Sequence, residues 1–211
     1  VTKIGDYAFE NCTNLASITI GDSVTCIGDG AFQWCDSIIS ITIPRNVNYI
    51  GDDALNDCRN LTKIAVDEEN KNYSSDEFGV LFNKDKTELI QAPDAISGEY
   101  VILESVISVE NYAFEYCTSL ASIIIPDNVS SIGIAAFFGC YDLTNVTIGN
   151  GITSIPRSAF EGCHFLREVT ISNSVTRIDD YSFYSCDLLR SLEIPNSVTT
   201  IGDSAFSYSG L

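Results

Sequence analysis

The chain is poor in the side chains on which many enzymes depend, since it contains one histidine, one tryptophan and no methionine. The single histidine, His164, leaves little material for general acid–base catalysis, in which histidine is the residue most often used. The sequence also has no Gly-x-Ser-x-Gly nucleophile motif, no phosphate-binding loop and no His-Glu-x-x-His motif. We therefore expect no catalytic residues, no metal site and no cofactor.

Long apolar runs are absent as well. No stretch approaches the roughly 18 consecutive apolar residues that a membrane-spanning helix needs, so we expect no membrane insertion by this segment. The first residues, Val-Thr-Lys-Ile-Gly, contain neither an initiator methionine nor the start of a signal peptide. The lack of methionine fits a segment of a longer precursor.

Basic residues are scarce, with 11 Lys and Arg against 29 Asp and Glu, and the formal charge is −18. This field repels phosphate, so nucleic acid is not an expected partner, and anionic membrane surfaces are disfavoured for the same reason. A high net charge also keeps a repetitive protein dispersed in solution, and we expect a monomer.

What the chain does have is one pattern that recurs every 23 residues: Ile-Gly-Asp-x-Ala-Phe-x-x-Cys-x-x-Leu-x-x-Ile-x-Ile-Pro-x-x-Val-x-x. The regular units begin at Ile4, Ile27, Ile50, Val109, Ile132, Ile155, Ile178 and Ile201. The step from Ile50 to Val109 is 59 residues, so one degenerate repeat there is 13 residues longer than the others. Both ends of the chain fall inside a repeat, and we expect the array to continue in the native protein.

Each position of the pattern predicts a local structure. Ala8, Phe9 and Cys12 have helical spacing and follow the turn residues Gly5 and Asp6, which predicts a short helical turn. The alternating stretch Leu-x-x-Ile-x-Ile at 15–20 predicts a strand. One coil cannot bury these apolar side chains alone, whereas coils stacked about 4.8 Å apart would share a continuous core.

The Leu-x-x-Ile-x-Ile element at 15–20 and its copies resemble the core of leucine-rich repeats. The repeat length, Ala-Phe-x-x-Cys and Ile-Pro-x-x-Val are similar to the BspA-like (treponemal-type) class of that family. The resemblance implies a single right-handed α/β solenoid over residues 1–211, with a parallel β-sheet on the concave face and short helical turns on the other side. Common leucine-rich repeats place an Asn ladder eight residues after the first Leu. Here that position holds Ser23, Asn46, Glu69, Asn128, Gly151, Ser174 and Ser197, so we expect these turns to be stabilised differently.

Residues 67–102 form the enlarged repeat. Within it, Gly79–Phe82 and Glu88–Ile90 flank the polar residues 83–87, which predicts a hairpin-like insertion. A similar Asn-x-x-Tyr…Gly-Val-Leu-Phe variant occurs in BspA-like proteins. Two interpretations stay open: a structural adaptor between repeats, which we favour, and a protruding binding element.

The cysteines follow the repeat. Seven of the eight occupy one position: Cys12, Cys35, Cys58, Cys117, Cys140, Cys163 and Cys186. Without a Cys-x-x-Cys cluster, this spacing predicts a buried column of free thiols, although stacked coils also bring equivalent residues close to disulfide distance. Cys26 lies outside the column, and we expect it to be the most exposed thiol.

Other candidate sites are weaker. His164 directly follows Cys163, but neighbours in sequence usually point apart, so we interpret His164 as a surface residue. Paired acids such as Asp52-Asp53 and Asp179-Asp180 fit capping positions at helix starts. A calcium site could draw on Asp67–Asn70 and Asp76-Glu77, although the EF-hand spacing is missing.

The outward positions of the predicted strands form the candidate binding surface. They are Ser17, Thr19, Ser40, Thr42, Lys63, Ala65, Ser122, Ile124, Asn145, Thr147, Glu168, Thr170, Ser191 and Glu193. Solenoids use such extended surfaces for partners, although exposed Ser and Thr are also simply good strand formers. A second candidate is the edge with the predicted helical turns, which carries Tyr7, Trp34, Tyr112, Tyr116, Tyr181, Tyr184 and Tyr208.

The sequence therefore favours binding over catalysis. The resemblance implies an extracellular, cell-surface module that binds proteins or glycans on host or neighbouring cells. A passive spacer within a surface protein, and a docking module attached to an enzyme, are the alternatives.

Overall fold

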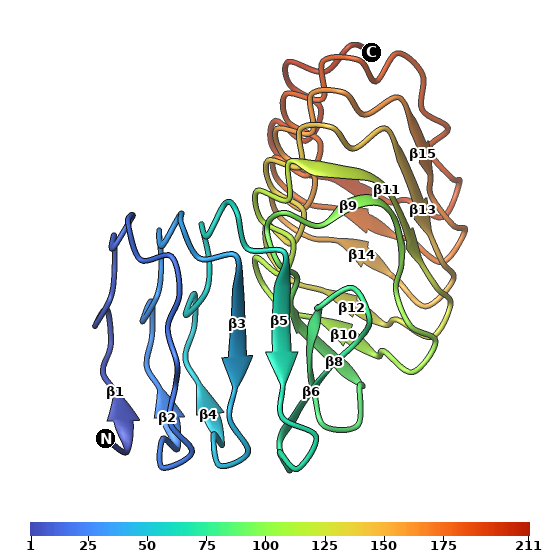
Figure 1. The fold of residues 1–211 in the computed structure, drawn as a ribbon. Coiled ribbons are helices and arrows are strands. Elements are labelled where there is room, and N and C mark those ends of the chain that lie inside the picture. The colour runs from blue at the N-terminus through green and yellow to red at the C-terminus, as the bar shows by residue number, and fades with distance from the viewer. The chain divides into compact units, whose positions relative to one another are not determined.

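The computed structural model describes all 211 residues, which divide into two compact units. The N-terminal unit comprises Val1–Lys86 and Ile90–Ile96, and the C-terminal unit comprises Thr87–Leu89 and Ser97–Leu211. Each unit is a stack of coils in which equivalent positions of successive repeats lie side by side (Figure 1). Each is a parallel β-solenoid with short strands and no helix.

The N-terminal unit holds the short strands of the first repeats and an antiparallel pair. Its strands are β1 (Lys3–Ile4), β2 (Cys26–Ile27), β3 (Ser40–Ile43), β4 (Tyr49–Ile50), β5 (Lys63–Val66), β6 (Tyr73–Ser75) and β7 (Leu81–Asn83). The parallel order β1-β2-β4 forms one edge of the coils, and β3 pairs with β5 in a second parallel sheet. β6 and β7 pair antiparallel, with Tyr73 opposite Asn83, and thus form a hairpin inside the enlarged repeat.

The C-terminal unit contains the longer strand ladder. Its strands are β9 (Ser97–Val101), β10 (Ser108–Val109), β11 (Ser119–Ile125), β12 (Ser131–Ile132), β13 (Asn145–Ile148), β14 (Ser154–Ile155), β15 (Glu168–Thr170), β16 (Arg177–Ile178) and β17 (Thr200–Ile201). β8 (Glu88–Gln91) starts in this unit and pairs with β10. The order β15-β13-β11-β9 gives one parallel sheet, while the short strands β14-β16-β17 form another.

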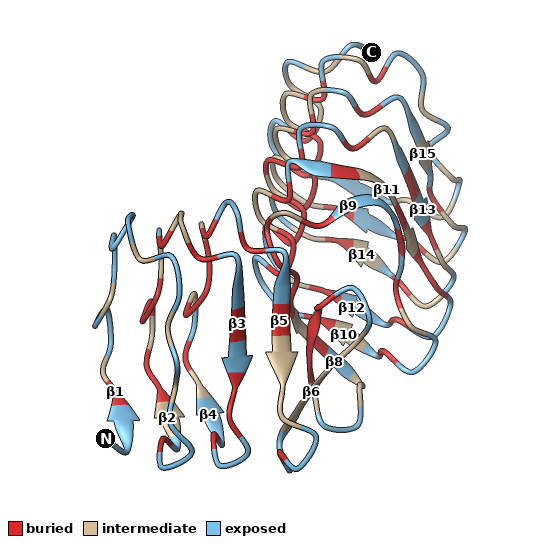
Figure 2. Ribbon diagram, in the orientation of Figure 1, coloured by how far each residue is buried: buried red, intermediate tan, exposed pale blue.

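The core of each unit lies inside its coils because the strands alternate. In β3 and β13 the residues are exposed, buried, exposed and buried in turn, as Figure 2 shows. A column of stacked aromatic rings completes the core of the C-terminal unit. Phe114, Phe137, Phe160, Phe183 and Phe206 follow one another with ring centroids 5.0 to 5.4 Å apart.

The expected helical turns are absent, and a ladder of turns takes their place. Within one coil, Ala8 donates its N–H to the Gly5 carbonyl, as in a turn, while Phe9 donates its N–H to Ala31 of the next coil at 2.8 Å. Bonds within a coil and bonds between coils alternate in this way along the edge. The prediction of helix was wrong because spacings of three and four residues also suit consecutive turns, whose hydrogen bonds partly run sideways.

Backbone dihedrals explain why no helix propagates here. In every regular unit the fourth and eighth residues have positive φ, for example Tyr7 (57°) with Asn11 (57°) and Ala135 (53°) with Gly139 (67°). A right-handed helix requires negative φ throughout. Most of these residues are not glycine, and each then costs about 1–2 kcal/mol, which the hydrogen bonds between coils must offset.

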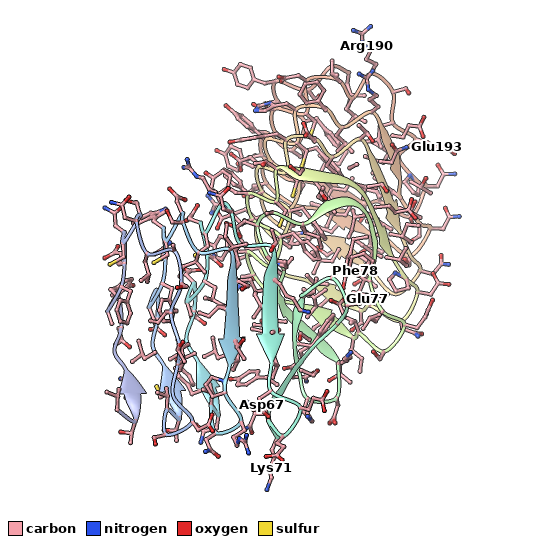
Figure 3. The ribbon with its side chains drawn as sticks, viewed as in Figure 1. Asp67, Lys71, Glu77, Phe78, Arg190 and Glu193 are labelled. Atoms are coloured by element: carbon pink, nitrogen blue, oxygen red, sulfur yellow. The ribbon has the colours of Figure 1, made fainter.

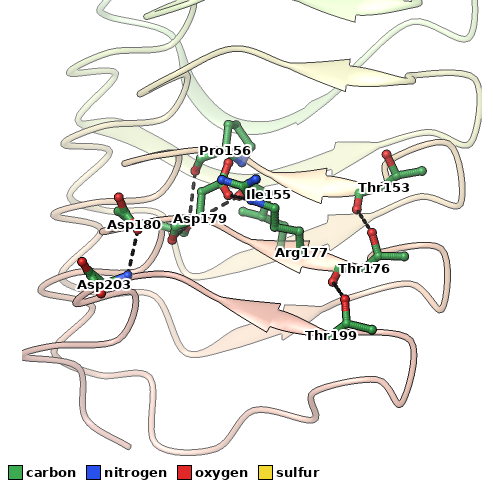
Figure 4. A network of polar contacts seen from close by, with 10 residues as sticks. Thr153, Ile155, Pro156, Thr176, Arg177, Asp179, Asp180, Thr199 and Asp203 are labelled. Carbon is green, nitrogen blue, oxygen red and sulfur yellow. Dashed lines mark hydrogen bonds and ion pairs between the residues drawn. The ribbon is translucent and has the colours of Figure 1, made fainter.

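The acidic residues at the start of this edge bond to the next coil instead of capping helices, which corrects the capping interpretation. Asp180 Oδ1 accepts the backbone N–H of Asp203 at 2.8 Å, and Asp29 Oδ1 accepts that of Asp52 at 3.2 Å. Figure 4 shows the first contact and, at the other end of the same short strands, a threonine ladder in which Thr199 Oγ1 donates to the carbonyl of Thr176. These ladders pair polar backbone groups between neighbouring coils.

The turns at the positions where common leucine-rich repeats have an Asn ladder are also stabilised by side chains that bond to a neighbouring coil. Asn46 and Asn128 donate their side-chain N–H to carbonyls of the preceding coil, Asp22 and Glu104, at 2.7 Å each. Ser197 donates its hydroxyl to the carbonyl of Val175, also at 2.7 Å. Short hydroxyls and amides thus perform the same task in different coils.

One buried asparagine ties the enlarged repeat to the coil before it. Asn70 donates its side-chain N–H groups to the carbonyls of Pro44 and Val47 at 2.7 and 3.0 Å, and its Oδ1 accepts the N–H of Tyr73. The Tyr73 hydroxyl in turn accepts the N–H of Ile50. These contacts fix the enlarged repeat against its neighbouring coil.

Candidate binding surfaces

The outward strand residues form two rows in each unit because the strands are parallel and in register. In the N-terminal unit, Ser40 lies beside Lys63 and Thr42 beside Ala65. In the C-terminal unit the first row runs Glu99, Ser122, Asn145 and Glu168, and the second runs Val101, Ile124, Thr147 and Thr170. We call these rows the strand face.

Most of the predicted residues of this face are exposed, while Ala65, Ser122 and Ile124 are half-buried. Ser17, Thr19, Ser191 and Glu193 are exposed too, although they lie in extended segments outside the assigned strands. Figure 3 shows Glu193 at the margin of its unit. Sequence analysis missed Glu99 and Val101 because they belong to the enlarged repeat, where the pattern is lost.

Side chains within a row are close enough to bond to one another. Asn145 Nδ2 donates to Glu168 at 2.9 Å, and the Ser122 hydroxyl donates to Glu99 at 3.3 Å. Short polar groups at inter-strand spacing can exchange such bonds for bonds to a partner at little cost, since both states are hydrogen-bonded. The strand face is therefore suited to polar contacts with a protein or a glycan.

The edge of the coils that is formed by the consecutive turns, which we call the turn edge, carries several aromatic side chains in the C-terminal unit. Tyr116 lies edge to face with Phe138, with ring centroids 5.4 Å apart, and near Tyr141 at 6.3 Å. Tyr141 stacks on His164 at 5.4 Å. Sequence analysis named Tyr116 but missed Phe138 and Tyr141, which the register of the coils brings beside it.

A glycine makes this gathering possible. A Cβ atom on Gly139 would lie 2.6 Å from a ring carbon of Tyr116, so the Tyr116 ring occupies the space where the next coil would carry a side chain. The same contact occurs in the N-terminal unit, where a Cβ on Gly30 would lie 2.5 Å from the ring of Tyr7. There, however, the other side chain near that Cβ position is Gln33, and no ring contact involves Tyr7.

Charged side chains cluster at another edge of the N-terminal unit. Arg45 contacts three acids, Asp22, Asp67 and Glu69. Beside it opens a polar hollow of about 530 Å³, lined by Arg45, Asn46, Asn48, Glu69, Lys71 and Asn72. Figure 3 shows Asp67 and Lys71 on the turn that follows β5. Because Arg45 is already paired with acids of its own unit, this hollow offers little uncompensated charge to a ligand.

The acidic residues considered as a weaker calcium candidate, and the neighbours Cys163 and His164, form no common site. Asp67 and Glu69 contact Arg45, while Asp76 accepts the N–H of Val80, and no three His, Cys, Asp or Glu side chains form a group that could hold a metal. The Cys163 thiol is buried and donates to the Phe137 carbonyl. His164 lies at the surface, with Nδ1 3.2 Å from Asp187 Oδ2.

All eight cysteines are free thiols, and the column is buried except at its first member. Five buried thiols donate to a phenylalanine carbonyl of the preceding coil: Cys35, Cys58, Cys140, Cys163 and Cys186. Burial raises the pKa of Cys186 from 9.0 to about 12. Cys12 is the exposed thiol and Cys26 is half-buried, which corrects the expectation for Cys26.

Comparison with known families agrees with the repeat. Residues 1–97 and 95–211 match the family model described as "BspA type Leucine rich repeat region". No curated protein sequence matches the chain. The structure also contains no helix of the length and apolarity needed to cross a bilayer.

Three solved bacterial structures are similar. A leucine-rich cell surface protein of Faecalibacterium prausnitzii is 35% identical with a TM-score of 0.89, and the match covers 99% of this chain and 55% of that one. The pneumococcal vaccine antigen PcpA is 25% identical with a TM-score of 0.88, covering 96% of this chain and 52% of that one. A leucine-rich repeat protein of Eubacterium ventriosum is 25% identical with a TM-score of 0.61, covering 100% and 81%. The chain thus spans about half the length of the first and second of these, and none of the three names states an enzymatic activity.

Proposed function

Because the chain belongs to the BspA-type leucine-rich repeat family, we propose that it is a non-catalytic, extracellular binding module of a cell-surface protein. It binds proteins or glycans on host or neighbouring cells through the strand face. The observation that carries the proposal is the pair of in-register rows of short, mainly polar side chains on β9, β11, β13 and β15.

The composition of these rows sets the kind of binding. Tight interfaces are anchored by buried aromatic residues and arginines, and the strand face has none. Hydroxyl, amide and carboxylate groups repeated at regular spacing favour many weak polar contacts. A ligand with repeated polar groups on a cell surface would gain from this spacing through multivalency.

A binding screen with the intact chain tests the proposal. We expect saturable binding to at least one immobilised matrix protein, glycan or whole-cell surface. The double variant Thr147→Arg/Thr170→Arg places bulky charges on adjacent strands of the face and should abolish that binding. The matched control, Thr153→Arg, changes an exposed threonine outside the strand face and should leave it intact.

Two outcomes would contradict this assignment. If the double variant still binds, the contact must lie on a surface other than the strand face. The absence of binding across the whole screen would favour the alternative that the chain is a passive spacer.

A further inference from the structure

The first part of the C-terminal unit has acidic side chains and no basic ones. Residues 97–156 contain no Lys or Arg, while the acids there are Glu99, Glu104, Glu110, Glu115, Asp127 and Asp142. In most proteins basic side chains are interspersed among such acids. The electrostatic field of this part of the unit therefore attracts cations. The same coils carry Tyr116, Phe138 and Tyr141, which we call the ring cluster.

The ring cluster lies within this field. Glu115, Phe138 and Glu161 occupy the same repeat position in three successive coils. Two backbone hydrogen bonds of 2.8 Å connect these coils, from Tyr116 N–H to the Phe138 carbonyl and from Gly139 N–H to the Glu161 carbonyl. Tyr141 is followed directly by Asp142. Ring faces and carboxylates thus alternate along the turn edge.

Aromatic surface in the cluster is open to solvent. Tyr141 is 39% exposed, while Tyr116 and Phe138 are half-buried. Gly162 lies beside Gly139, and a Cβ on Gly162 would meet only the backbone of Gly139, at 3.7 Å. Gly139 itself is buried under the Tyr116 ring, whereas Gly162 is half-buried. A long side chain from a partner can therefore lie along Gly162 and reach the rings without displacing a side chain at that glycine.

The same edge contains an intramolecular example of the contact. Arg157 lies over the ring of Tyr181, with its guanidinium carbon 5.7 Å from the ring centroid. A cation over an aromatic face is attracted by the ring quadrupole, more strongly when nearby water is displaced. Phe138 and Tyr141 present ring surface on the same edge two coils before Tyr181, and Tyr116 does so three coils before it.

From this combination we propose that Tyr116, Phe138 and Tyr141, with Glu115, Asp142 and Glu161, bind a lysine- or arginine-rich segment of a partner protein. A basic side chain lies against the rings, and the carboxylates hold its neighbours. This basic-segment site is separate from the strand face and does not depend on it. Charge complementarity selects the partner, since an acidic glycan or nucleic acid would be repelled by the same carboxylates.

The test is a titration of the intact chain with a fluorescent decalysine peptide, followed by anisotropy at low and physiological salt. We expect Tyr141→Ala to weaken binding about three- to tenfold, since a cation–π contact of ordinary strength accounts for a change of that order. Tyr141→Phe keeps the ring face and should bind as the wild type does. Glu161→Gln should weaken binding and make it less dependent on salt.

Two controls separate ring recognition from general attraction between opposite charges. Tyr7→Ala removes a tyrosine that also lies over a glycine but belongs to the N-terminal unit, and it should bind decalysine normally. Glu168→Gln on the strand face should likewise leave binding unchanged.

The site would be refuted if Tyr141→Ala bound decalysine as tightly as the wild type, or if Glu168→Gln weakened binding as much as Glu161→Gln. Competition by an uncharged hexasaccharide at the same rings would also overturn it, because the rings would then serve as a sugar platform. The strand-face variant Thr147→Arg/Thr170→Arg should still bind decalysine, so failure of one proposal is distinguishable from failure of the other.

Discussion

The N-terminal and C-terminal units are built from the same coil, but their interiors and edges are filled differently. In the N-terminal unit the ring column consists of Phe9 and Phe32, since Leu55 takes the ring position in the third coil. In the C-terminal unit the rings from Phe114 to Phe206 form an unbroken column. The N-terminal unit instead contains the buried polar contacts of Asn70.

The difference shows which parts of the repeat are free to vary. Backbone ladders between coils are the same in both units, because they depend on register and not on side-chain identity. Outward positions can therefore change from coil to coil without loss of the fold. That freedom allows one unit to acquire an aromatic and acidic edge while the other acquires the Arg45 ion cluster.

The largest contrast we expect is in thiol reactivity. At pH 8 the exposed Cys12 should react with a disulfide reagent within the mixing phase and Cys26 more slowly, while the six buried thiols should react only at the rate of unfolding. The measurement is site-resolved labelling by mass spectrometry. Rapid labelling of Cys163 or Cys186 in the folded chain would contradict the buried column.

The same burial predicts a loss of stability at alkaline pH. Burial raises the pKa of Cys186 from 9.0 to about 12, so folding favours the neutral thiol. This contribution is complete below pH 9 and is lost as the pH rises toward 12. The urea midpoint of the wild type should fall between pH 8 and pH 11 by more than that of Cys186→Ala.

Truncation of a core phenylalanine should destabilise the C-terminal unit more than the N-terminal unit. Phe137→Ala opens a cavity between two stacked rings and should lower the free energy of unfolding by about 3–5 kcal/mol. Phe9→Ala removes a ring that is half-buried and has one stacking partner, so the loss should be clearly smaller. Urea denaturation of both variants provides the comparison. Equal losses would mean that the ring column adds nothing to the stability of the C-terminal unit.

Truncation of an asparagine should instead cost more stability in the N-terminal unit than in the C-terminal unit. Asn70→Ala leaves the buried carbonyls of Pro44 and Val47 without their donor and should cost about 2–3 kcal/mol. Asn128→Ala breaks an exposed contact to Glu104 and should cost about 1 kcal/mol or less. Thermal unfolding of the two variants checks the ranking. A cost for Asn128→Ala that matched the cost for Asn70→Ala would show that the buried contacts of the enlarged repeat are not special.

The smallest effect concerns backbone strain on the turn edge. Ser158 has a φ of 56°, at the same repeat position where Gly30 stands in the N-terminal unit. Ser158→Gly should raise the free energy of unfolding by up to about 1 kcal/mol, because glycine adopts this region without steric cost. A destabilised variant would show that the Ser158 side chain makes a contact worth more than the strain.

Much of the fold follows from the repeat alone. The positions of Phe137, Cys140 and Val146 in the core are predictable, because a fixed repeat length places equivalent residues in columns. The structure of the turn edge was not predictable, because the Ala-Phe-x-x-Cys spacing suits both a helix and consecutive turns. Only the hydrogen bonds between coils decide between the two structures, and these depend on neighbours 22 residues away, as for Phe9 and Ala31.

The candidate surfaces show the same division. The strand-face residues of the regular repeats were predicted, because alternation along a strand is visible in the sequence. Glu99 and Val101 were not, because the enlarged repeat interrupts the pattern. The ring cluster was predicted only in Tyr116. Its partners Phe138 and Tyr141 come from the next coil, and Gly139 matters through the side chain that it lacks.

Both proposed surfaces depend on coils that are hydrogen-bonded to their neighbours along the strand face and along the turn edge. Amide hydrogen exchange tests this directly. The N–H groups of Phe114 and Phe137, which donate to Ala136 and Ala159 of the following coils, should exchange as slowly as the strand N–H of Val146. Fast exchange at Phe114 and Phe137, beside a protected Val146, would mean that the turn edge is not a ladder and that its ring cluster is not held in place.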